Sequence, residues 1–167
     1  STHFPKLPHC PHCQWAKMQQ APGRRRHLDT KMSPIPEKFG DQITADHIVA
    51  NSEWNMGITG DKTALIIKDR ATDYLGGYPL KTKSGDDARA ALDDFQGPGK
   101  PVRVCYSDNS PELIDAIRAL KWLKGRSTPG LPRTNAVAER TVRRVCEGVR
   151  TLLVSAGLPA CFWPWAL

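Results

Sequence analysis

The sequence predicts an α/β domain in which helices cover a central sheet. Short segments rich in β-branched residues precede and alternate with segments that have the 3.6-residue apolar period of a helix. Turns that contain Gly, Pro, Asn or Asp separate these segments. No run of about 18 apolar residues exists, so we expect no transmembrane helix.

Five segments have the composition of strands. Residues 42–49, 63–68 and 74–80 follow one another, and Gly76-Gly77 loosens the third of these strands. Residues 102–106 predict a fourth strand, and a short extended piece over 125–128 predicts a fifth. We therefore expect a sheet of about five strands.

Three segments predict helices. Ser84 is a suitable N-cap for a helix that ends before Gly97-Pro98-Gly99. Pro111 opens a second helix, whose apolar side extends through Leu120 to Trp122. The longest helix begins at Asn135 and continues to about Ala156. Its predicted core stripe consists of Ala138, Val142, Val145, Val149 and Leu152.

The charge distribution suggests that the chain has a short basic N-terminal part and a longer part with an acidic centre and a basic end. Residues 1–36 carry a net charge of +5, residues 37–124 of −2, and residues 125–167 of +4, within a total of +7. Basic ends around an acidic centre suit a protein that contacts phosphates and holds cations, although basic surfaces also simply keep proteins soluble. We predict a small module with a basic linker over 1–36, and a larger domain over 37–167.

Three acids stand at positions that suggest chemistry. Asp46 lies inside an apolar strand, where a carboxylate is costly unless it meets a cation or a cleft, although it could be a satisfied structural Asp. Asp108 follows a strand, where α/β proteins place functional groups, but its neighbours also suit a simple turn. Glu139 borders the apolar stripe of the long helix, and an exposed pair with Arg143 is the alternative.

Taken together, these positions resemble the integrase core of copia-type retrotransposons and retroviruses. Residues 68–74 and 78–84 are similar to that family's second and third strands. Ser107-Asp108-Asn109 resembles its S-D-N block, and residues 134–140 (TNAVAER) resemble its N-G-V-A-E-R block. Leu158-Pro159 with Phe162-Trp163 resembles the segment after the catalytic helix.

Two departures from the family pattern lie near these blocks. Ser110-Pro111 replaces the usual Gly-Gly, and Ala136 replaces a Gly. Both leave the carboxylates untouched, but the loop near Asp108 is expected to have a different shape.

The resemblance implies a partial zinc-binding module with a basic linker over 1–36, and a catalytic core over 37–167 that is truncated at its C-terminus. It implies a ribonuclease-H-like fold for the core, with a mixed sheet of about five strands flanked by helices. It implies that Asp46, Asp108 and Glu139 are catalytic and bind Mg²⁺ or Mn²⁺. Asp46 would bridge two ions, and Asp108 and Glu139 would each hold one. The implied activity is that of an integrase, a DNA strand transferase and nuclease that uses two metal ions for 3′-end processing and strand transfer.

The same resemblance implies partners and a place of action. The expected partners are double-stranded DNA of the element ends and of the target, and further copies of the chain in a homo-oligomer, with no membrane. We expect an intracellular protein that acts in the nucleus. Two alternatives stay open: a catalytically inactive or domesticated fragment that binds DNA, and a ribonuclease-H-type nuclease.

Two further residue groups carry predictions. Cys10 and Cys13 form a CxxC pair, which resembles the closing half of the family's His-His-Cys-Cys module, and His3 is the third candidate ligand of a partial Zn²⁺ site. Phosphate contacts are expected from two sets of arginines, each of which could also be a solvated face. These sets are Arg24, Arg25 and Arg26, and Arg140, Arg143, Arg144 and Arg150.

Overall fold

The computed structural model describes residues 9, 36–50, 52–99, 101–126 and 136–167. The chain divides into two compact units, Ser1–Ser33 and Pro34–Leu167. All helices and strands described below belong to the second unit. The predicted zinc-binding module falls almost entirely outside the described residues, so it stays a prediction.

The described part of the second unit contains one mixed sheet with the strand order β3-β2-β1-β4-β5. The strands are β1 (Ile43–Val49), β2 (Thr63–Asp69), β3 (Leu75–Leu80), β4 (Val104–Ser107) and β5 (Leu123–Arg126). The first three strands form an antiparallel meander, whereas β4 and β5 run parallel to β1. The predicted five-stranded mixed sheet is confirmed.

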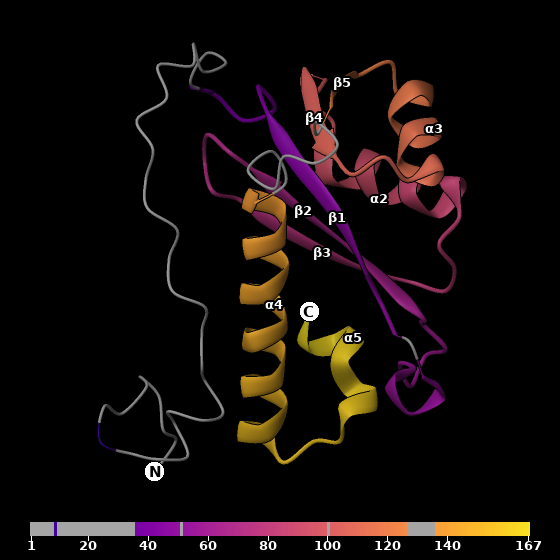
Figure 1. Cartoon of the computed structure of the whole chain (residues 1–167), viewed down its shortest axis with the longest axis vertical. Helices are drawn as coiled ribbons and strands as arrows, with labels where there is room; N and C mark the ends of the chain where they lie inside the picture. Colours follow the sequence, from indigo (N-terminus) through magenta and orange to yellow (C-terminus); the bar gives the residue numbers. More distant parts are fainter. Residues whose placement is uncertain (1–8, 10–35, 51, 100, 127–135) are drawn as a thin grey trace. The chain divides into compact units, whose positions relative to one another are not determined.

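Helices cover both faces of this sheet (Figure 1). On one face α2 (Gly85–Gln96) and α3 (Pro111–Ala119) pack against each other, whereas α4 (Ala136–Ala156) packs against β1 and β2 on the other face together with α5 (Trp163–Ala166). Two short 3-10 helices, η1 (Glu53–Asn55) and η3 (Ala160–Phe162), precede β2 and α5. The main core lies between the sheet and the α2–α3 pair. Its largest fully buried members include Ile43, Leu65, Ile67, Leu92, Leu113 and Ile117.

A local sequence signal explains where α2 begins. The Ser84 side chain accepts a hydrogen bond from the Asp87 N–H, so this residue caps α2 as predicted.

Strand β3 has no side chain at Gly76 or Gly77. A Cβ at Gly76 would lie 2.8 Å from the Phe95 ring of α2, and one at Gly77 would lie 2.6 Å from Leu167. The two glycines therefore allow α2 and the C-terminal segment to approach this strand closely.

Three predicted boundaries are wrong by a few residues. Helix α3 ends at Ala119, and Lys121 has a φ of 59°, so Trp122 lies beyond the helix and enters the core from the chain before β5. Strand β5 begins two residues earlier than expected, and β4 begins two residues later. The left-handed conformation of Lys121 follows the end of α3, and the apolar pattern of the sequence does not reveal this conformation.

The stripe of α4 is wrong at its last position. Leu152 is 58% exposed, whereas Leu153 is 7% exposed. The predicted spacings of four and three average 3.5 residues per turn, whereas a straight helix has 3.6, so the predicted stripe rotates away from the buried face by about 40° over four turns.

No single helix in the described ranges is long and apolar enough to cross a membrane. Val137–Ala156 and Ala160–Ala166 pass the same criteria of length and composition only as a pair bent by 120°.

Candidate active site

The parallel register places Asp46 and Asp108 at equivalent points of neighbouring strands. Ala45 of β1 is paired with Ser107, the last residue of β4, and each aspartate is the next residue along the chain. Ile43, Ala45 and Cys105 belong to the core between the sheet and α2–α3. Because successive side chains of a strand alternate between the faces, Asp46 and Asp108 project toward the opposite face, which α4 covers.

The surroundings of Asp46 disfavour its charged form. Burial raises the pKa of this carboxyl to about 6, and the negative charges of Asp108 and Glu139 add to the shift. A hydrogen bond from the His47 N–H (2.9 Å to Oδ1) and the charge of Lys83 oppose it. The dependence on both acids shows that the three predicted carboxylates share one electrostatic environment.

Asp108 and Glu139 differ in how they are held. The Oδ1 of Asp108 accepts a hydrogen bond from the Ser110 N–H (3.2 Å), which fixes the carboxylate over the turn into α3. Glu139 lies in the first turn of α4 and is exposed. An acid there interacts favourably with the dipole of the helix. Strand β4 and its following turn thus position one carboxylate, and α4 positions the other.

Asp69, at the end of β2, shows what a structural aspartate looks like in this protein. Its side chain is fully buried. Oδ1 accepts a hydrogen bond from the Gly40 N–H (2.9 Å), and Oδ2 accepts three from the Ala71 N–H (3.1 Å), the Thr72 N–H (2.8 Å) and the Thr72 hydroxyl (2.8 Å). Asp46 has no comparable set of donors.

The donor set at Asp46 and Asp108 fits a hard divalent cation. Carboxylate oxygens are the ligands that Mg²⁺ and Mn²⁺ prefer, and a cation between the two groups would remove the repulsion that raises the pKa of Asp46. No group of three His, Cys, Asp or Glu side chains in the described ranges is placed to hold a metal ion. The two aspartates therefore supply a pair of ligands, and Glu139 would have to move closer to complete a three-carboxylate site.

Two residues beside this pair were missed in the sequence. Both ring nitrogens of His47 are buried without a hydrogen-bond partner among the described residues. Burial and the charge of Lys83 lower the pKa of this imidazole. Lys83 also forms a 3.5 Å ion pair with Glu112. The position of His47 directly after Asp46 was the available signal, but only the fold shows that Lys83 lies within electrostatic range of both.

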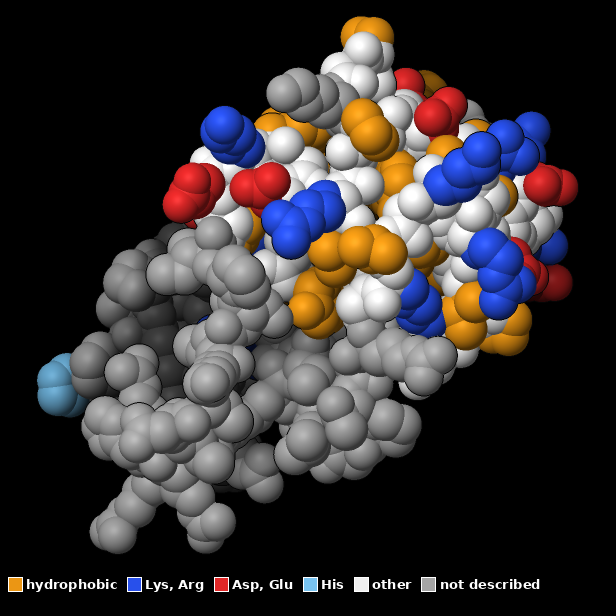
Figure 2. All heavy atoms as spheres, turned by 90° about the horizontal axis from the view of Figure 1, so that it is seen from above, with side chains coloured by type: hydrophobic (Ala, Val, Ile, Leu, Met, Phe, Trp, Pro, Cys, Tyr) orange, Lys and Arg blue, Asp and Glu red, His pale blue; other side chains and the backbone are white. Residues whose placement is uncertain are grey.

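The four predicted phosphate-binding arginines of α4 are all exposed, but they do not share one site. Arg140, Arg143 and Arg144 line a hollow together with Lys68 of β2. Arg150 instead lines a mostly apolar pocket between α4, β1 and the C-terminal segment. On the face seen in Figure 2, Lys and Arg side chains lie singly among hydrophobic and acidic ones.

The remaining predicted site residues lie outside the described ranges. They are His3, Cys10, Cys13, Arg24, Arg25 and Arg26. The zinc site and the basic linker therefore stay predictions.

Comparison with known proteins gives matches in both sequence and fold. No family model matches the chain. The retrovirus-related Pol polyprotein from transposon TNT 1-94 of Nicotiana tabacum is 32% identical over 114 residues, which cover 62% of this chain and 8% of that protein. The corresponding polyprotein from transposon RE2 of Arabidopsis thaliana is 32% identical over 108 residues, which cover 61% and 7%.

Among solved structures, the catalytic core domain of BIV integrase superposes with a TM-score of 0.53 over 76% of this chain and 80% of that one, at 13% identity. This likeness establishes the fold. The chain spans less than a tenth of the length of the curated relatives that it matches. The resemblance to the integrase cores of retroelements is confirmed: this chain is similar in sequence to a segment of two retrotransposon Pol polyproteins, and it has the ribonuclease-H-like fold of an integrase catalytic core.

Proposed function

We propose that this chain is the catalytic core of a retrotransposon integrase, which processes the 3′ ends of element DNA and joins them to target DNA. The observation that carries the proposal is the pair Asp46, in the middle of β1, and Asp108, directly after the adjacent parallel strand β4, with the pKa of Asp46 raised to about 6. A half-buried acid whose charge is destabilised by desolvation and by a neighbouring acid is typical of functional sites. Homology to Pol polyproteins supports the same class of enzyme.

The three carboxylates would act as metal ligands. Asp46 and Asp108 supply oxygen atoms from the sheet, and Glu139 supplies a third carboxylate from α4. Bound Mg²⁺ or Mn²⁺ would activate the attacking oxygen and stabilise the leaving oxygen of a phosphodiester. The Asp46 carboxyl, with a pKa of about 6, is mostly ionised at neutral pH, so it is ready to bind a cation there.

The proposal extends to partners and location. The substrates are double-stranded element ends and target DNA, and the exposed arginines of α4 supply positive charge for their backbones. Joining two ends to one target requires more than one active site, so we infer a homo-oligomer. The target lies in the nucleus, so the chain would act there.

One assay separates this proposal from its alternatives. The chain is incubated with Mn²⁺ and either a labelled element-like duplex with target DNA or an RNA–DNA hybrid. Joining of the labelled strand to target supports the integrase. Cleavage of only the RNA strand would instead indicate a ribonuclease H, and binding without any cleavage would indicate an inactive DNA-binding fragment. Either of these two outcomes overturns the proposal.

A further inference from the structure

Helix α4 turns a cationic face away from Glu139. With 3.6 residues per turn, Arg140 and Arg144 lie about 100° and 140° around the helix axis from Glu139. Arg143 lies only about 40° from Glu139 by the same geometry. Arg140 and Arg144 therefore point toward a different part of the molecule from the catalytic carboxylates.

This face borders a hollow with a volume of about 390 Å³, here called the cationic hollow. Its lining residues are Lys68, Val137, Arg140, Thr141, Arg143, Arg144 and Glu147. The hydroxyl of Thr141 donates to the Val137 carbonyl (2.8 Å), so it is already engaged. The three arginines form no ion pair within the described part of the chain, which leaves their guanidinium groups available for an anion.

Lys68 is the one lysine of the hollow, and an acid holds it. Its Nζ lies 2.7 Å from Oδ1 of Asp73, with the lysine side chain 22% exposed and the aspartate side chain 80% exposed. Asp73 has a φ of 61°, which places it in the tight turn between β2 and β3. The charge of Arg144 also acts on Asp73. Asp73 is thus an internal anion beside a cluster of cations.

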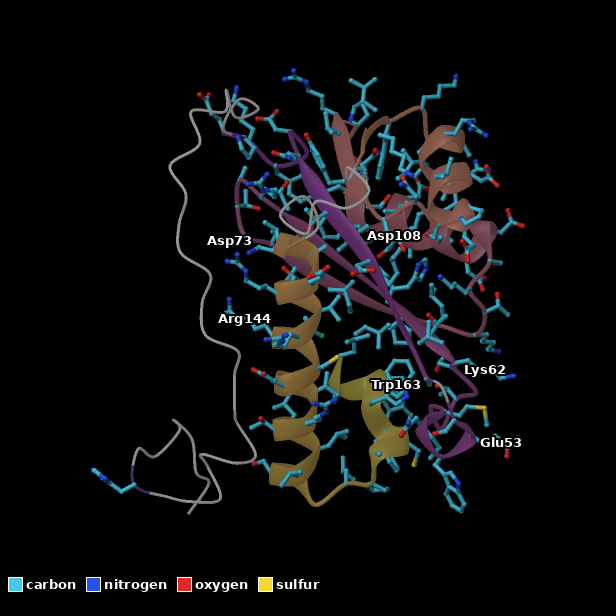
Figure 3. All side chains as sticks on the ribbon, viewed as in Figure 1. Glu53, Lys62, Asp73, Asp108, Arg144 and Trp163 are labelled. Atoms are coloured by element: carbon cyan, nitrogen blue, oxygen red, sulfur yellow. The ribbon has the colours of Figure 1, made fainter. Side chains whose placement is uncertain are left out.

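Figure 3 shows Asp73 and Arg144 on one side of α4, with Asp108 on the other. A phosphate in the cationic hollow would therefore belong to a different part of the nucleic acid from the phosphodiester at the carboxylates. Four cations surround the hollow against the two acids Glu147 and Asp73, so its net charge favours an anion.

We propose that the cationic hollow binds a backbone phosphate of duplex DNA away from the reacting bond, and that Asp73 competes with this phosphate for Lys68. Lys68, Arg140 and Arg144 contact the phosphate, while Arg150 takes no part. The inference rests on the proposed function, because it assigns part of the DNA that such an enzyme would hold. It adds Lys68 and Asp73, which the sequence pattern did not single out.

The test is binding of a fluorescently labelled duplex, followed by anisotropy over a range of salt concentrations in the absence of metal. Lys68→Gln and Arg144→Gln are each expected to weaken binding about fivefold at low salt and to lower the slope of log K against log salt by about one. Arg89→Gln is the matched control, because Arg89 is an exposed arginine of α2 on the other face of the sheet. It is expected to leave both quantities near wild type.

Asp73→Asn tests the competition. It is expected to tighten binding about threefold, because Lys68 is then free for the phosphate. The same change is expected to have little effect when Lys68 is already Gln, since no cation is left to release. Asp93→Asn, a change of one exposed acid on α2, controls for net charge alone. Melting curves of all variants check that each is folded.

Wild-type affinity and slope in both Lys68→Gln and Arg144→Gln would overturn the inference, and so would an equal gain from Asp73→Asn and Asp93→Asn. The strand-transfer assay is read separately. If the wild-type chain joins DNA while the hollow variants bind normally, the hollow assignment alone is wrong. If the wild-type chain neither joins nor cleaves DNA, the proposed function itself is wrong.

Discussion

Two aspartates belong to neighbouring strands of the same sheet and have opposite surroundings. Asp69, at the end of β2, is fully buried and accepts four hydrogen bonds from the turn that follows it and from Gly40. Asp46, in β1, receives one hydrogen bond from its own neighbour His47 and faces the charges of two other acids. The first carboxylate completes a turn, whereas the second accepts a single hydrogen bond from the described residues.

This difference shows what distinguishes a structural acid from a functional one. Asp69 is fully buried and Asp46 is half-buried, so the more buried acid is the structural one and burial alone does not identify a site. The hydrogen bonds that the carboxylate oxygens accept are more informative, because a carboxylate that is removed from water and has few donors costs free energy unless a ligand compensates it. Under the proposed function, a bound cation would compensate this cost at Asp46.

The largest expected effect is the loss of activity from Asp46→Asn and Asp108→Asn. Each change keeps the shape of the side chain but removes the charge that holds a divalent cation, so strand transfer should fall about a thousandfold or more. Binding of duplex DNA should stay near wild type. The measurement is a gel-based joining assay with Mn²⁺, and Asp93→Asn should retain full activity. Wild-type turnover in either site variant would remove that residue from the site.

Asp69→Asn should affect stability in the opposite way from Asp46→Asn. An amide nitrogen in place of a carboxylate oxygen would face backbone N–H donors, so we expect a loss of about 3 kcal/mol in the free energy of unfolding. Asp46→Asn should cause no such loss. Urea unfolding followed by circular dichroism measures both. Equal destabilisation by the two changes would mean that Asp46 is a structural acid as well.

Much of the fold and of the carboxylate pair follows from the sequence. The strands have a β-branched pattern, and Ser84 signals the start of α2 with its own hydrogen bond. The motif around Asp108 and the strand position of Asp46 locate two acids that the parallel register then brings to neighbouring positions. Here the backbone geometry alone sets the side-chain position, so local patterns are sufficient.

Features that depend on helix rotation or on side chains from separate elements could not be predicted. Leu152 and Leu153 are both apolar, and only packing decides that Leu153 is buried. Lys68 and Arg144 are far apart in sequence and share the cationic hollow only because α4 crosses β2. Asp69 and Asp46 look alike in the sequence, because the Gly40 N–H that satisfies Asp69 comes from 29 residues away.

Binding of Mg²⁺ or Mn²⁺ should stabilise the wild-type chain and not the Asp46→Asn variant. A cation that binds only the folded state raises the melting temperature, and a concentration ten- to a hundredfold above the dissociation constant corresponds to about 5 °C. Thermal unfolding with either metal and with EDTA measures the shift. Asp93→Asn is expected to respond like the wild type. Equal shifts in the wild type and Asp46→Asn would place the cation elsewhere.

The smallest expected effect is a pH-dependent gain in stability of Asp46→Asn without metal. The pKa of Asp46 is raised from an ordinary value of 3.8 in the unfolded chain to about 6 in the folded chain. The folded state therefore binds the proton more tightly, and the stability of the wild type falls as the pH rises from about 4 to 6. Above about pH 6 the charged carboxylate destabilises the folded chain, whereas below about pH 4 the neutral acid causes no such destabilisation.

An asparagine carries no charge at any pH, so its advantage should appear only above the window. Because the carboxyl is partly open to solvent, we expect a gain of about 1 kcal/mol, or about 3 °C, at pH 7.5 with EDTA. At pH 4 the two proteins should melt together. Asp93→Asn should show no such divergence, because Asp93 is an exposed residue of α2, on the other face of the sheet from Asp46. A constant difference between wild type and Asp46→Asn at both pH values would mean that the charge of Asp46 is not the cause, and that Asp46, like Asp69, is satisfied in the folded chain.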